Sequence, residues 1–247
     1  MTVIDQIMRL DTARWINGKI GDLPDRAKFR AASAIRSLQW ASNNYHAEMP
    51  IPAAYFALHA TEEAVAAFVS CTKVCGYGED AKINLKDHKA KASVSLLAQK
   101  VSNLLADYRL GIALDPISDK IIVRFKIDNS IQYREASTKL LHFTNGRYGE
   151  QKSDFLEDII AQFGDISALK DAVLSGQEAR NVILYATNTG LPTGFVDPEA
   201  SLRRECQLTL GLIWAAIDVT HNQDTPIAFI AQALRTANMV IAEMKSK

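Results

Sequence analysis

Residues 25–48, DRAKFRAASAIRSLQWASNNYHAE, and residues 49–75, MPIPAAYFALHATEEAVAAFVSCTKVC, decide the fold. In the first stretch, apolar residues recur at helical spacing after Asp25, a residue type that caps helices. They define one core-facing side: Ala27, Ala31, Ala34, Ile35, Leu38, Ala41 and Tyr45. Pro50 and Pro52 end this helix and start the next, because proline fits the first turn of a helix but not its interior. The two stretches therefore predict consecutive long helices.

Helical patterns continue on both sides of this pair. We expect further helices at about 3–16, 86–108, 131–143, 153–163, 166–187, 199–221 and 226–245. The segment near 112–130 differs, since it is rich in β-branched residues between turn signals, and it predicts a hairpin or an irregular insertion. Helices joined by short loops, without strand–helix alternation, indicate an all-α, antiparallel up-and-down bundle rather than an α/β sheet. We expect a single helical domain over 1–247.

Composition and charge restrict the class of protein. The chain has 28 Lys and Arg against 28 Asp and Glu, and this zero balance disfavours a broad nucleic-acid or membrane surface while allowing a local basic pocket. Acidic residues interrupt the apolar run of the first 15 residues, which is atypical of a signal peptide, and the run from Leu208 to Val219 is too short to span a membrane. We expect a cytoplasmic protein with no membrane contact.

Three cysteines, Cys71, Cys75 and Cys206, are too few and too unevenly spaced for a disulfide framework. Cys71 and Cys75 lie one helical turn apart and would provide half of a metal site. No second Cys/His pair follows at zinc-finger spacing. We therefore expect no metal and no other cofactor.

Polar residues interrupt the apolar side of the second long helix at Glu62 and Glu63. Glu62 falls within the stripe formed by Leu58 and Val65, where a carboxylate needs a partner because burial disfavours its charge. One interpretation is a structural ion pair with a basic residue of another helix. Another is a same-face pair with His59, three residues before Glu62, which would suit a small-molecule enzyme.

The start of the next helix, LKDHKAKA (85–92), carries His88, Lys89 and Lys91. One interpretation is a solvated basic face. Cations are disfavoured near a helix N-terminus by the helix dipole, so a bound anion or a bundle carboxylate would explain them better.

A later helix, QEARNVILYATN (177–188), places Arg180, Asn181 and Tyr185 beside its buried side. Arginine stays charged and seldom borders a core without a carboxylate or phosphate to bind. One interpretation is a structural salt bridge between Arg180 and Glu62. The other is a site for a phosphate group.

Taken together and in this order, the segments AAYFALHATEEAVAAFV (53–69), LKDHKAKA (85–92) and EARNVILYA (178–186) resemble the HEPN superfamily of helical nucleotide- and RNA-associated domains. The likeness is nearest to the abortive-infection (AbiV-type) branch of bacterial phage-defence proteins. It covers about residues 26–220, so the N-terminal and C-terminal helices are additions to an HEPN-like core. Ala64-Val65 stand where the family usually has Gly-Lys.

The resemblance implies a bacterial anti-phage protein that acts on or binds RNA or nucleotides, with a metal-independent endoribonuclease as one activity. Arg180 would hold the scissile phosphate, Asn181 would orient it or cap a neighbouring helix, and the site would be shared across a homodimer. Ribonuclease members carry histidine where this chain has Tyr185, and a phenol with a pKa near 10 transfers protons poorly. His88 would then supply the acid/base group. Further substrate contacts would come from Glu62, Glu63, Lys89 and Lys91.

The alternative is a non-catalytic helical module that senses a nucleotide, or a partner or phage trigger protein. The neutral charge balance and the tyrosine at position 185 favour it. The two hypotheses differ in geometry: an open basic cleft at Arg180 and His88 favours catalysis, whereas a buried Arg180–Glu62 bond favours a binding module.

Overall fold

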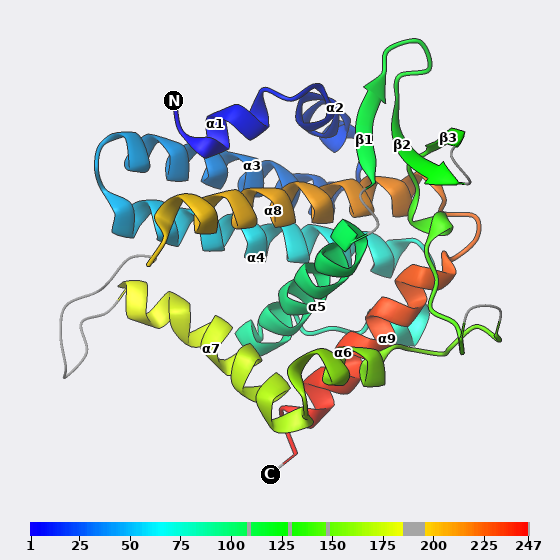
Figure 1. Cartoon of the computed structure of the whole chain (residues 1–247). Helices are drawn as coiled ribbons and strands as arrows, with labels where there is room; N and C mark the ends of the chain where they lie inside the picture. Colours follow the sequence, from blue (N-terminus) through cyan, green and yellow to red (C-terminus); the bar gives the residue numbers. More distant parts are fainter. Residues whose placement is uncertain (108–109, 128–129, 147–148, 185–195, 247) are drawn as a thin grey trace.

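The computed structural model describes residues 1–107, 110–127, 130–146, 149–184 and 196–246, and it is mostly helical (Figure 1). The helices are α1 (Val3–Met8), α2 (Asp11–Lys19), α3 (Asp25–His46), α4 (Pro50–Val74), α5 (His88–Asp107), α6 (Leu156–Phe163), α7 (Ile166–Leu184), α8 (Pro198–His221) and α9 (Ala228–Glu243). The strands are β1 (Gly111–Asp115), β2 (Lys120–Ile127) and β3 (Ser130–Glu135). Short 3₁₀ turns lie at Ile20–Asp22, Gly78–Ala81 and Thr138–Leu140.

Helices α3 and α4 form the predicted antiparallel pair. Arg30 of α3 binds Glu63 of α4, and further along α3 Trp40 packs against Phe56, which lies earlier in α4. Residue numbers that rise on one helix and fall on the other define the antiparallel direction. The α3 residues predicted to face the core are buried except Tyr45, which is half-buried. Alanine at most of these positions lets the two backbones approach closely.

Helix α8 lies along α4 but runs parallel to it, so the expected up-and-down order is wrong for this pair. The Thr61 hydroxyl contacts Glu205, and the Thr220 hydroxyl contacts Cys71, so residue numbers rise together on the two helices. Helices α3, α4 and α8 make one layer, and α5, α7 and α9 lie obliquely to it (Figure 1). Helix α5 packs on α4, α7 and α9, while α7 also contacts α4.

The insertion is a three-stranded antiparallel sheet in the order β1-β2-β3. It extends to Glu135, so the helix expected over 131–143 is wrong: its first half is strand β3, paired from Ile127↔Ser130 to Ile122↔Glu135, and a 3₁₀ turn follows. The Trp15 indole of α2 donates to the Asp119 carbonyl at 2.8 Å beside β2. At the other end, the Thr138 amide donates to Asp218 of α8 at 2.7 Å. The sheet is thus held at two points.

The N-terminal segment forms two helices instead of the single one expected over 3–16. Thr2 and Asp5 make a reciprocal capping box at the start of α1. The Asp5 carboxylate also accepts from Ser42 at 2.6 Å and contacts His46 Nε2 at 2.9 Å, which fixes α1 to α3. Within the described residues, no helix is both long and apolar enough to cross a membrane.

Candidate functional site

Three consecutive residues of α4, Thr61, Glu62 and Glu63, reach three different helices. Successive side chains on an α-helix point about 100° apart, because the helix has 3.6 residues per turn. Thr61 contacts α8, Glu62 contacts α5 and Glu63 contacts α3. These three residues therefore connect α4 to α8, α5 and α3.

Glu62 meets two of the three basic residues predicted at the start of α5. Lys91 Nζ lies 3.3 Å from Glu62 Oε2, and His88 Nδ1 lies 3.4 Å from the same oxygen. The Lys91 side chain is only 11% exposed, whereas the His88 side chain is 47% exposed. Lys91 is therefore not part of a solvated face, and that interpretation is wrong for it. His88 keeps access to solvent beside the carboxylate.

Helix α5 begins at His88 because Asp87 caps it: the Lys89 backbone amide donates to Asp87 Oδ1 at 2.9 Å. This cap fixes the first turn, which sets His88 and Lys91 one turn apart toward Glu62. The Lys89 side chain points elsewhere and is exposed.

Glu63 is more deeply buried than Glu62 and pairs with Arg30. One guanidinium nitrogen, Arg30 Nη1, donates to both carboxylate oxygens at 2.7 and 2.9 Å. The Glu63 side chain is 7% exposed and the Arg30 side chain 52% exposed. The structural ion pair between helices that was expected at Glu62 is present there with Lys91, and Glu63 makes a second one with Arg30. His59, the other predicted neighbour of Glu62, stacks on the Tyr55 ring with centroids 6.0 Å apart.

The third predicted motif lies on α7, the helix that packs against both α4 and α5. Val173 and Ile183 are buried as expected, and Asn181 is exposed. Arg180 belongs to α7, but its side chain lies outside the described part, and Tyr185 lies wholly outside the described residues. The expected Arg180–Glu62 bond therefore falls outside the description.

A buried carboxylate that the sequence analysis missed lies on α8. Glu205 accepts a hydrogen bond from Thr61 at 2.7 Å and another from Arg204 Nε at 3.1 Å. Burial raises the pKa of Glu205 above its usual range, and these two hydrogen bonds oppose the rise only in part. Its signal was an acid at helical spacing from two apolar residues, Leu202 and Leu208.

The cysteines show no metal-binding arrangement. All three are buried free thiols, and burial raises the pKa of Cys71 to about 11 and that of Cys206 to about 12. Thiols with such pKa values stay protonated near neutral pH. Among the residues that the structure describes, no three His, Cys, Asp or Glu side chains are grouped to hold a metal ion.

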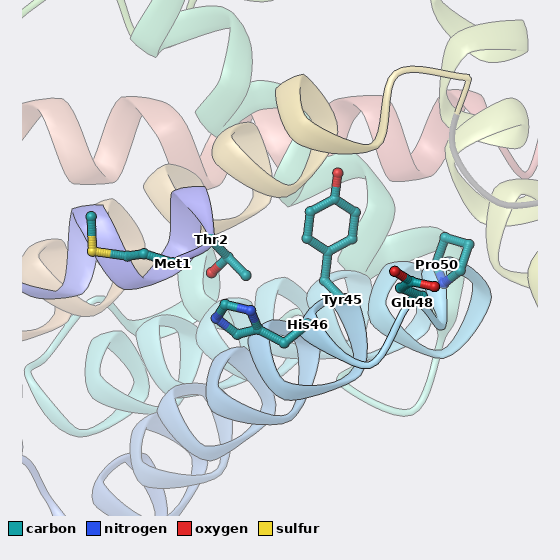
Figure 2. A pocket seen from close by; sticks show the side chains of 6 residues that line it. All are labelled: Met1, Thr2, Tyr45, His46, Glu48 and Pro50. Atoms are coloured by element: carbon teal, nitrogen blue, oxygen red, sulfur yellow. The ribbon is translucent and has the colours of Figure 1, made fainter.

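Two cavities lie away from these residues. One, of about 510 Å³, is lined by Met1, Thr2, Tyr45, His46, Glu48 and Pro50, where α1 meets the α3–α4 connection (Figure 2). The other, of about 470 Å³, lies between the segment 139–142 and the start of α9. None of the predicted site residues lines either cavity.

The comparisons with known proteins assign no family: no family model, no curated protein and no solved structure matches the chain. A proposal of function therefore rests on two observations. Glu62 of α4 contacts His88 and Lys91 of α5, and α7 packs against both helices.

Proposed function

We propose that this chain is an RNA- or nucleotide-directed effector of the HEPN type, in which His88 acts as the acid/base group and Glu62 orients it. The observation that carries the proposal is the 3.4 Å contact between His88 Nδ1 and Glu62 Oε2, with the imidazole half exposed. A carboxylate close to one ring nitrogen favours the proton on that nitrogen, so in the proposal Nδ1 carries the proton and Nε2 accepts one.

Metal-independent RNA cleavage needs few groups. His88 Nε2 would take the proton of a ribose 2′-hydroxyl, whose oxygen then attacks the adjacent phosphorus. The P–O5′ bond breaks, the departing oxygen takes a proton from an acid, and the products are a 2′,3′-cyclic phosphate and a 5′-hydroxyl end. The resemblance assigns to Arg180 the stabilisation of the negative charge on the phosphate. It lies on α7, which packs against both α4 and α5.

The burial of each residue refines the roles that the resemblance implied. Lys91 and Glu63 are largely enclosed in ion pairs, so in the proposal they position α5 and α3 rather than touch the substrate. Lys89 and Asn181 are exposed and remain candidates for contacting the phosphate backbone. A homodimer with facing α7 helices belongs to the same proposal.

A non-catalytic binding module is the second candidate, and one observation favours it. Lys91 and Arg30, which would otherwise bind phosphate, are engaged by Glu62 and Glu63. In such a module the ion pairs would only fix the helices, and a nucleotide or a partner protein would bind without being altered.

Expression in a bacterium separates the two candidates. We expect the wild-type chain to arrest growth and to fragment tRNA or total RNA, and we expect Arg180→Ala and His88→Asn to abolish both effects. His221→Asn is the matched control, because His221 is also half exposed and lies 3.6 Å from a carboxylate, that of Asp22. Intact RNA during growth arrest by the wild type would contradict the catalytic proposal and favour the binding module.

A further inference from the structure

The outer face of α3 carries a row of exposed cations and aromatic rings. Arg26, Phe29, Arg36 and Trp40 follow one another at helical spacing on the side away from the alanine-rich core face. Phe29 is 69% exposed and Trp40 is 43% exposed, although large aromatic side chains are usually well buried. From Phe29 to Trp40 the row is about 17 Å long at 1.5 Å per residue.

This row is positively charged although the whole chain is neutral. Helix α3 contains Arg26, Lys28, Arg30 and Arg36 but only one acid, Asp25. Among the described residues, neither Arg26 nor Arg36 forms an ion pair. The guanidinium of Arg36 instead lies 5.3 Å from the centre of the Trp40 ring, a cation–π contact that holds it beside an exposed aromatic face.

Aromatic contacts continue from this row toward the proposed site. Trp40 meets Phe56 of α4 edge to face at 5.2 Å, Phe56 meets Tyr55 at 5.3 Å, and Tyr55 stacks on His59. Glu62, which contacts His88, lies one turn beyond His59 on the same side of α4. The ring contacts therefore connect the α3 row to the turn of α4 next to Glu62.

We propose that the α3 row, defined as Arg26, Phe29, Arg36 and Trp40, binds single-stranded RNA and directs it to His88. The inference rests on the proposed function and names the surface by which that substrate is held. Guanidinium groups attract the phosphates, and exposed rings stack on unpaired bases whatever their sequence. A duplex would not use the rings, since its bases are already stacked. A second copy of the chain does not fit this surface, because it would place the arginines of one row against those of the other.

The test is the anisotropy of a fluorescein-labelled 2′-O-methyl oligouridylate, whose blocked 2′-oxygen prevents cleavage. We expect Phe29→Ala to weaken binding about tenfold, the loss typical of one stacking platform. The double variant Arg26→Glu/Arg36→Glu should weaken binding further and reduce the salt dependence of log Kd by about 0.7 for each arginine. Circular dichroism checks that the variants keep the fold.

The β-sheet supplies the matched control, because Arg124 and Tyr133 are an exposed, directly paired cation and aromatic ring. Arg124→Glu/Tyr133→Ala should bind the oligonucleotide like the wild type. The inference is overturned if the wild type does not bind, if the control loses as much affinity as the α3 variants, or if Phe29→Ala only converts a dimer to a monomer in gel filtration.

The same variants separate this inference from the proposed function. If the wild type cleaves RNA and the α3 variants bind with unchanged affinity, the α3 row is not the RNA-binding surface, and the proposed activity stands. If the α3 variants lose binding while His88→Asn binds normally and the wild type cleaves nothing, the RNA surface stands and the catalytic proposal falls.

Discussion

Arg30 and Glu63 join α3 to α4 through a single nitrogen: Nη1 of Arg30 donates to both oxygens of the Glu63 carboxylate, at 2.7 and 2.9 Å. The carboxylate is enclosed, whereas the guanidinium is half exposed, so the arginine brings its charge to a buried acid. Removing the arginine would leave the acid without compensation, which is costlier than losing both groups.

We therefore expect Arg30→Met to lower the free energy of unfolding by about 1–3 kcal/mol in urea denaturation. Arg26→Met, four residues earlier on the same helix, should change it by less than about 0.5 kcal/mol. The double variant Arg30→Met/Glu63→Met should be more stable than Arg30→Met alone. Equal effects at positions 26 and 30 would show that the pair contributes nothing to the fold.

The raised pKa of Glu205 predicts that the folded protein loses stability as the pH rises. Burial raises its pKa in the folded protein above the value of about 4.3 for an exposed glutamate, so the folded state holds the proton more tightly than the unfolded chain does. The stability contributed by this proton is fully present below the unfolded pKa and is lost as the pH rises through the folded pKa. Glu205→Gln removes that loss, so its stability relative to the wild type should increase with pH.

Urea denaturation at several pH values measures this difference. Glu199→Gln is the control, because Glu199 lies on the same helix with a side chain that is 62% exposed. A difference between Glu205→Gln and the wild type that stays constant with pH would mean that Glu205 is ionised at no cost in the folded protein.

The lowered pKa of Asp5 predicts the opposite pH dependence: the folded protein loses stability as the pH falls. Burial alone would raise its pKa, but hydrogen bonds from Ser42, Thr2 and His46 outweigh burial and hold the pKa well below the usual range. The stabilisation is therefore present above the unfolded pKa of about 3.9 and is lost as the pH falls through the folded pKa.

Accordingly, Asp5→Asn should lower the free energy of unfolding by about 1–2 kcal/mol at neutral pH, and the difference should shrink in acid. Hydrogen exchange should show earlier opening of the α1 amides in the variant. Asp11→Asn serves as the control, since the Asp11 side chain is 75% exposed. Unchanged exchange in α1 would contradict an anchoring role for Asp5.

Much of the fold follows from local sequence signals. The core face of α3 was predicted from its alanine spacing, and the prolines at 50 and 52 correctly marked the start of α4. The strand β3 was missed because Tyr133, Ala136 and Leu140 have helical spacing, and pairing of β3 with β2 decides for a strand. The parallel course of α4 and α8 depends on contacts between distant residues, which local periodicity does not specify.

The site was predicted in part for the same reason. Helix α4 is apolar almost all round, so periodicity could not tell that Glu63 is more buried than Glu62. The basic residues that open α5 were identified, but only the packing of α5 against α4 shows that Lys91 is enclosed and His88 is exposed. Glu205 was overlooked because an isolated acid in a long helix resembles many surface acids.

Cleavage of RNA by the purified chain tests the central claim, that His88 oriented by Glu62 acts on RNA. Labelled tRNA is incubated with the protein in EDTA, and the fragments are separated on a denaturing gel. We predict that the wild type and His221→Asn yield fragments with 2′,3′-cyclic phosphate ends, and that His88→Asn cleaves at least a hundredfold more slowly, as expected for loss of an acid/base group. Cleavage by His88→Asn at the wild-type rate, or tRNA left intact by the wild type, would contradict the claim.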